Sequence, residues 1–250
     1  MSILSIVPNN IAAVMLISAR ITPLFIGAGS SPFSRIPIMV RLIFVLVFAI
    51  SISQIITYEH LSLADLIIGI FTELFIGLTF LLVIHAAFSA LLFWGRVVDM
   101  QIGLGAAGII NPATKSQDSL TGTIVSLLAT TLFFVMGIHL LLLETVVFSY
   151  SVFPLGKWGM WLSPQKLASF WGIEFLTAMM LFAPIMITIW SLDIIVGMLS
   201  KTMPQVNIYF VTLPLKIGVG IVLFSVMANY SKPIFEKLFN QMLSVLHVGG

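Results

Sequence analysis

Ionisable side chains inside apolar stretches are the residues of this sequence that could do chemistry. Glu73 and His85 share one such stretch, and His139 and Glu144 share another. Because a charged group in hydrocarbon is costly, each should face a helix partner or a water-filled space, or serve in a proton relay. Glu73 and His85 are 12 positions apart, and the 5 positions from His139 to Glu144 turn a helix by about 500°, so neither pair shares a face. Neither spacing suits a metal pair.

Two further features belong to this interior set. Arg20 lies in the last third of the first apolar segment, where its long side chain could snorkel to the interface. Asp193 and Lys216 lie in the last two apolar segments, on either side of a short turn. The interior polar and structural residues that the sequence singles out are Arg20, Glu73, His85, His139, Glu144, Asp193, Pro204, Gln205, Asn207 and Lys216.

Motifs of enzymes are missing from the sequence. It has no cysteine, which excludes disulfides, thiolate metal sites and cysteine nucleophiles. It also has no phosphate-loop motif, no H-E-x-x-H and no G-x-S-x-G elbow. We therefore expect no catalytic residue, no metal, no cofactor and no enzymatic activity.

The composition determines which solvent the elements must suit. The chain of 250 residues is 60% hydrophobic and 8% charged, with a mean hydropathy of +1.17. A soluble domain carries about a quarter charged residues, so these values indicate an integral membrane protein or part of a lipid-contacting assembly. The expected fold class is an all-α membrane protein. A net charge of +2 gives no basic surface for nucleic acid.

About six long hydrophobic helices should position these residues. Because roughly 20 apolar residues cross a bilayer core, the expected segments are 3–26, 38–57, 66–94, 123–148, 168–199 and 208–230. The first is expected to be a retained helix, since no cleavage site follows it. A tail after residue 230 has apolar residues at helical spacing and is expected to lie along a membrane surface or against a partner. Basic residues divide five against four between the two sides, which leaves the membrane orientation open.

A glycine-rich stretch, 96–119, interrupts the apolar sequence near its middle. Gly103 to Gly108 match G-x-G-x-x-G, but the flanks are membrane-length helices and not a βαβ unit, so a dinucleotide site is rejected. Asp99 and Asp118 flank the stretch and are expected to cap helix ends instead of forming an acid/base pair. The glycines and aliphatic residues suit a constriction or plug that faces an occluded space. An ordinary solvent loop is the alternative, and the large aliphatic side chains argue against it. The residues of this expected plug are Met100, Gln101, Gly103, Leu104, Gly105, Gly108, Ile109, Ile110, Asn111 and Pro112.

Several motifs in order along the chain resemble one family. They are RITP from Arg20 with the following IPIMVRL, Glu73 before Gly77, MQIGLGAAGIINP, GIHL from Gly137 with the later FPLG, and SLDIIVGMLSKTMPQVNIYFVTLPLKIGVG. Together they resemble the FliR/SctT family of the type III secretion export apparatus over nearly the whole chain. Family members often have Asp-Pro where this chain has Asn111-Pro112, a change that keeps a turn former and removes a charge.

The resemblance implies a core channel subunit of the flagellar type III protein export gate. Its helices would form bent hairpins in a gate with FliP-like and FliQ-like subunits and an FlhB-like switch protein, in the bacterial inner membrane at the flagellar basal body. Residues 1–160 would be a FliP-like part that includes the plug, and residues 161–250 a FliQ-like hairpin with the amphipathic tail. Unfolded flagellar proteins would pass through the pore, which the glycine-rich loop would close at rest.

A secondary transporter of a small solute is the alternative. It too would use broken helices and a mid-membrane site, with Glu73, His85, Asp193 and Lys216 as its polar residues. A transporter should act alone, whereas a gate subunit should be unstable until it enters a complex.

Overall fold

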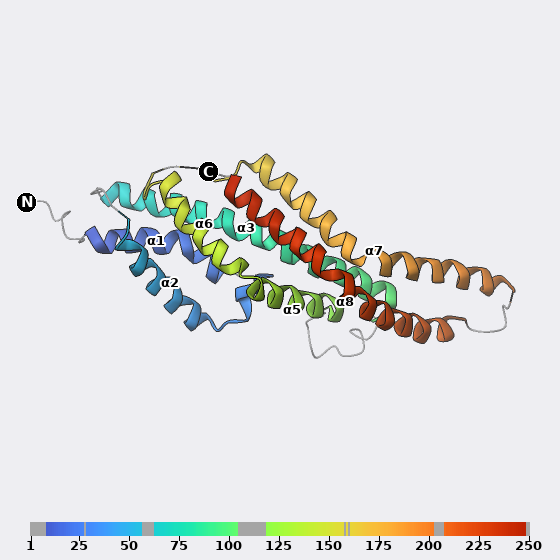
Figure 1. Cartoon of the computed structure of the whole chain (residues 1–250). Helices are drawn as coiled ribbons and strands as arrows, with labels where there is room; N and C mark the ends of the chain where they lie inside the picture. Colours follow the sequence, from blue (N-terminus) through green and yellow to red (C-terminus); the bar gives the residue numbers. More distant parts are fainter. Residues whose placement is uncertain are drawn as a thin grey trace, which may run out of the picture. The chain divides into compact units, whose positions relative to one another are not determined.

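The chain folds into helices throughout the part that the structure describes (Figure 1). The computed structural model describes residues 9–27, 29–56, 63–104, 119–157, 159, 161–202 and 208–248, and no strand occurs in these ranges. The elements are, in chain order, α1 (Asn9–Ile26), the short 3-10 helix η2 (Pro32–Arg35), α2 (Ile38–Ser53), α3 (Leu63–Ile102), α5 (Leu120–Val135), α6 (Ile138–Val152), α7 (Pro164–Thr202) and α8 (Ile208–Val248). The expected all-α class is confirmed.

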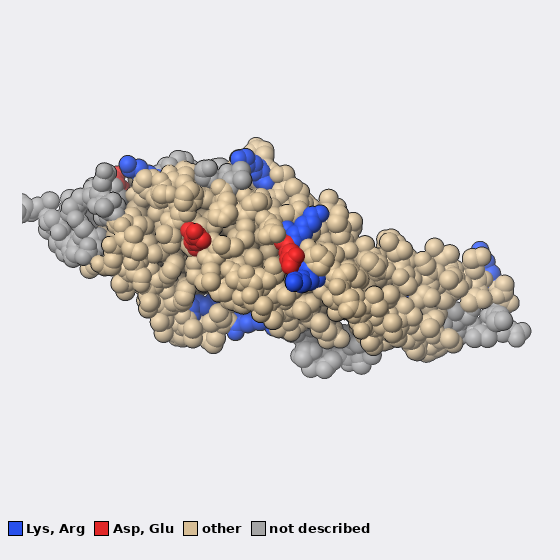
Figure 2. Space-filling model, viewed as in Figure 1, with Lys and Arg blue, Asp and Glu red and all other residues tan. Residues whose placement is uncertain are grey.

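The helices differ in whether they are long and apolar enough to cross a membrane. Among the described residues, three helices are long and apolar enough to cross a membrane: Asp65–Ile102, Pro164–Thr202 and Phe210–His247. The broken pair α5 and α6 would make a fourth span, while α1 and α2 contribute shorter apolar helices. The face drawn in Figure 2 shows few charged side chains. These helices are those of a membrane protein. Six long helices were expected, whereas the described residues form three long helices, one broken pair and two shorter helices.

Three predicted boundaries were wrong. The third segment continues as helix to Ile102, so the first residues of the glycine-rich stretch are helical. The fourth segment is broken where Gly137 takes a left-handed φ of 72°, a conformation that glycine adopts without the steric cost of a side chain. The sixth segment and the tail form one helix of 41 residues, with Pro214 and Pro233 inside it.

The expected exposure of the tail was also wrong. Leu238, Phe239, Met242 and Leu246 are fully buried by the chain itself, not laid on a membrane surface or a partner. The indole Nε1 of Trp161 donates a hydrogen bond to the carbonyl oxygen of Leu246 at 3.1 Å. The apolar spacing predicted a helix with one buried face, but it could not predict what buries that face.

Two compact units are distinguished within the chain. One comprises Met1–Ala86, Phe133–Trp171 and Gln241–Gly250, and the other comprises Ala87–Leu132 and Gly172–Asn240. The proposed correspondence of residues 1–160 and 161–250 to FliP-like and FliQ-like parts stays a prediction.

Candidate functional site

Arg20 and Glu73 form the buried ionic centre of the first unit. Arg20 pairs through Nε with Glu73 Oε2, and its Nη2 donates to Glu73 Oε1 at 3.0 Å. Its Nη1 donates to Ser149 Oγ at 2.8 Å, and Nη2 also donates to the carbonyl oxygen of Phe153 at 2.9 Å. Both charged side chains are fully buried, so the snorkelling expected for Arg20 was wrong. The physical reason is that Glu73 and the α6 terminus satisfy the guanidinium inside the unit.

Neighbouring groups complete this Arg20 cluster. The amide of Gly156 donates to Glu73 Oε1 at 3.0 Å, and the Tyr150 ring lies 4.1 Å from the guanidinium carbon of Arg20. A side chain on Gly77 would collide with the carbonyl oxygen of Arg20, so α1 and α3 approach closely there. Each charge therefore has its partners, which favours a structural clamp over a proton relay for Glu73.

The three other ionisable residues that the sequence singled out in this unit lie apart from that cluster. His85 is half-buried with its ring against Gly29, where an added Cβ would lie 2.5 Å from His85 Cε1. The His139 ring packs against Phe134 at a centroid distance of 5.1 Å. Glu144 is exposed on α6. The sequence singled out all of these residues, but the structure gives them separate environments.

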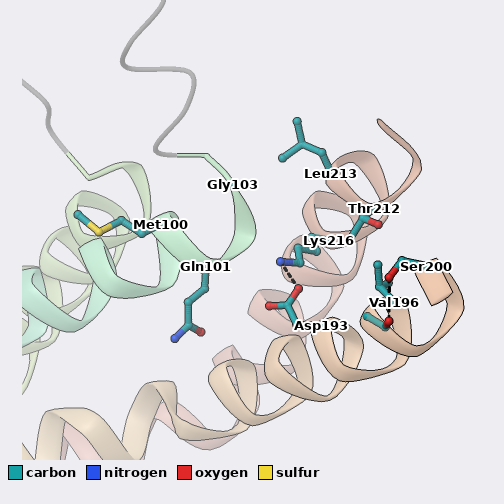
Figure 3. A pocket seen from close by; sticks show the side chains of 10 residues that line it. Met100, Gln101, Gly103, Asp193, Val196, Ser200, Thr212, Leu213 and Lys216 are labelled. Atoms are coloured by element: carbon teal, nitrogen blue, oxygen red, sulfur yellow. Dashed lines mark hydrogen bonds and ion pairs between the residues drawn. The ribbon is translucent and has the colours of Figure 1, made fainter. Parts of the chain in front are cut away.

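A second ion pair lies in the other unit, where Lys216 of α8 contacts Asp193 of α7. The Asp193 side chain is 44% exposed and that of Lys216 is 17% exposed. The pair lines a cavity of about 420 Å³, shown in Figure 3, together with Met100, Gln101, Gly103, Val196, Gly197, Ser200, Thr212 and Leu213. This cavity brings two residues of the interior set beside three of the expected plug.

The cavity lies where α3 ends. Gly103 has φ +94°, and its amide donates to the carbonyl oxygen of Asp99 at 3.1 Å, a geometry typical of a helix terminated by glycine. Met100 and Gln101 are thus in the last helical turn, and Gly103 and Leu104 form the turn after it. The remaining expected plug residues, Gly105, Gly108, Ile109, Ile110, Asn111 and Pro112, lie outside the described residues, as do Pro204, Gln205 and Asn207.

Asp99 caps a helix, as the sequence predicted, but the helix is α5. Its carboxylate accepts a hydrogen bond from Ser119 Oγ at 2.6 Å and from the amide of Thr121 at 3.2 Å. Ser119 Oγ in turn accepts from the amide of Gly122 at 2.8 Å. Because Asp99 is buried, these hydrogen bonds replace the ones that its carboxylate would make to water. Asp118 lies outside the described residues.

Sequence reasoning missed two features of this unit. Gly95 on α3 faces Gly122 on α5 so closely that a side chain on Gly95 would overlap the Gly122 backbone. The spacing of Gly95 and Asp99 by one helical turn was an available signal. Glu174 on α7 is fully buried, and neither of its carboxylate oxygens has a hydrogen-bond partner.

Chemically, the described side chains provide positioning and ion pairing. Within the described ranges, no group of three or more His, Cys, Asp or Glu residues could hold a metal ion. Within the described residues, the arrangement defines a helical membrane protein with one buried ion pair, two ion pairs that are at least partly exposed, and a helix, α3, that ends directly before Gly103.

Comparison with known proteins identifies the family. Residues 11–242 match the model of the bacterial export proteins, family 1, and the chain belongs to that family. It is 25% identical to the flagellar biosynthetic protein FliR of Bacillus subtilis over 180 residues, which cover 70% of each chain. It is 27% identical to FliR of Escherichia coli over 178 residues, covering 70% of this chain and 67% of that one.

A relative from another export system is similar to the same degree. The Yop proteins translocation protein T of Yersinia pestis is 28% identical over 193 residues, which cover 76% of this chain and 72% of the relative. The relatives are components of type III export apparatus, as the resemblance implied. The alternative of a small-solute transporter has no support among them.

Proposed function

We propose that this chain is the core channel subunit of a flagellar type III protein export gate. It would act in the bacterial inner membrane, at the flagellar basal body, without enzymatic activity. The observation that carries the proposal is the family match over residues 11–242, which covers two of the three long apolar helices of the described residues completely and the third, Phe210–His247, up to residue 242. Unfolded flagellar proteins would be its export substrates.

The partners of the gate would be FliP-like and FliQ-like subunits and an FlhB-like switch protein. The second unit supports such a role, because α7 and α8 expose many large apolar side chains, among them Ile194, Met198, Phe210 and Val222. Asp193 is exposed on the same helices, where contact with hydrocarbon would be costly. Protein neighbours or a water-filled pore would satisfy that carboxylate, whereas lipid would not.

The central glycine-rich segment would close the pore at rest. Its start supports the assignment: α3 ends at Ile102, directly before Gly103, and Met100 is exposed on the last turn. The cavity beside that end contains the ion pair of Asp193 and Lys216, a polar environment at a helix terminus.

Co-purification tests the gate assignment. The chain is expressed with and without FliP-like and FliQ-like subunits from the same genome, and its yield and particle size are measured. We expect a stable product only in the large complex. A solitary chain that is stable and catalyses substrate-dependent counterflow would overturn the assignment.

Deletion of residues 103–108 tests the closure. In an assembled gate, the deletion should raise small-ion permeability while the complex keeps its composition. Unchanged permeability in a complete complex would show that the segment does not form the seal.

A further inference from the structure

We propose that Asp99 is a positioning residue that fastens the first turn of α5 to the last turns of α3. This contact, which we call the junction, joins the residues that precede the segment 105–118 to those that follow it. Any effect of the junction on gating rests on the proposed function. The contacts of Asp99 themselves do not depend on that function.

Asp99 terminates one helix and begins the next. Its backbone oxygen accepts the amide of Gly103, which closes the end of α3. Its carboxylate accepts the Ser119 hydroxyl at 2.6 Å and the Thr121 amide at 3.2 Å, at the start of α5. One residue therefore supplies acceptors for donors on both sides of the central segment.

The hydrogen bonds at the start of α5 form a chain that ends on Asp99. The amide of Gly122 donates to Ser119 Oγ, and the Ser119 hydroxyl donates to Asp99 Oδ2. An ordinary N-cap side chain satisfies first-turn amides from its own helix. Here Ser119 does so for Gly122, but Thr121 depends on a carboxylate 22 residues earlier in the chain. Without Asp99, the buried Thr121 amide and Ser119 hydroxyl would lose this acceptor.

Close packing of α3 against α5 brings the Asp99 carboxylate within hydrogen-bond distance of the start of α5. Leu92, Gly95 and Asp99 follow one another at spacings of three and four residues, so they share a face of α3. A Cβ on Gly122 would lie 2.9 Å from the Leu92 carbonyl oxygen, and a Cβ on Gly95 would overlap Gly122 itself. The two glycines permit a contact between helices that a side chain on either would prevent.

Distance measurements across the junction test the inference. The chain contains no cysteine, so Met100→Cys and Leu120→Cys introduce two spin-label sites at exposed positions on α3 and α5. The labelled full chain is assembled with its partner subunits, and a complex without the two introduced cysteines gives the background. Label-to-label distances are then compared for Asp99, Asp99→Asn and Asp99→Ala.

We expect a narrow distance distribution with Asp99, a broader and longer one with Asp99→Ala, and partial recovery with Asp99→Asn, which keeps one oxygen acceptor. Glu236→Gln serves as the matched control, because this carboxylate is partly exposed on α8 and its 3.7 Å pair with Lys232 is local. The distribution should not change in that control. Unchanged distances in Asp99→Ala would overturn the inference.

If Asp99→Ala fails to assemble, Ser119→Ala and Asp99→Asn decide the result. Ser119→Ala removes one of the donors to Asp99 and keeps the Thr121 amide contact. Broadening in both supports the junction, and wild-type distributions in both overturn it.

Ion permeability of the same complexes separates this inference from the proposed function. Broadened distances with increased permeability support both. Broadened distances without increased permeability support the junction and count against closure by the central segment. Increased permeability in the deletion of residues 103–108, with unchanged distances in Asp99→Ala, supports closure and overturns the junction.

Discussion

Among the described residues, the two ion pairs that join different helices differ in how many hydrogen-bond partners the chain gives each charge. Arg20 and Glu73 are fully buried and share their hydrogen bonds with Ser149, Phe153 and Gly156. Asp193 and Lys216 have each other, and the Asp193 side chain is 44% exposed. A buried pair that is complete within one unit holds helices together, whereas an exposed pair leaves charge available to something outside the chain.

The largest effect is expected from breaking the buried pair on one side. Arg20→Ala would leave the Glu73 carboxylate buried without its guanidinium, at a cost of about 3–5 kcal/mol. Thermal unfolding of the purified complex and the yield of the chain measure the loss. The double substitution Arg20→Met with Glu73→Leu should recover much of the stability, because it removes both charges. Equal stability of Arg20→Ala and the parent would show that the buried pair of Arg20 and Glu73 does not stabilise the fold.

Crowding the same cluster should have the next largest effect. Gly77→Ala places a methyl group against the carbonyl oxygen of Arg20, so α1 and α3 must separate. Overpacking of this kind costs about 1–3 kcal/mol. The unfolding midpoint of the complex measures it, with Gly172→Ala as the control, because an added Cβ at Gly172 meets nothing within 4 Å. Similar midpoints for the two variants would contradict the close approach.

The exposed pair should affect export more than stability. Asp193→Asn removes an interaction that is worth about 0–1 kcal/mol at an exposed site. We nevertheless expect reduced export or weaker partner association, because the substitution removes a negative charge that is 44% exposed on α7. The exchange of Asp193→Lys with Lys216→Asp separates two explanations. Restored export would indicate that only the pair matters, and continued loss would indicate that the position of each charge matters.

The smallest effect is expected at the local pair of Lys232 and Glu236. Glu236→Gln breaks an exposed contact of 3.7 Å within one helix, worth about 0.3–0.5 kcal/mol. Unfolding, complex yield and export should match the parent within error. A loss of stability as large as that of Arg20→Ala would contradict the expected difference between buried and exposed ion pairs.

The sequence predicted much of what depends on local pattern. Apolar length predicted membrane helices, and the glycine-rich stretch predicted a break after α3, because glycine at a helix end favours termination. The cap by Asp99 was predicted in kind. The helix that it caps was not predictable, since Thr121 comes next to Asp99 only when α3 and α5 pack together.

Sequence determined which groups needed a partner, and tertiary structure decided which partner each received. A charge in an apolar segment is costly wherever that segment lies, so Arg20, Glu73, Asp193 and Lys216 were recognisable from their positions within apolar segments of the sequence. Spacing along one helix could not pair Arg20 with Glu73, because they are 53 residues apart on different helices. It also could not show that one pair is fully buried and the other half open. Those differences arise from helix packing, which sets the dielectric surroundings and the neighbouring donors of each charge.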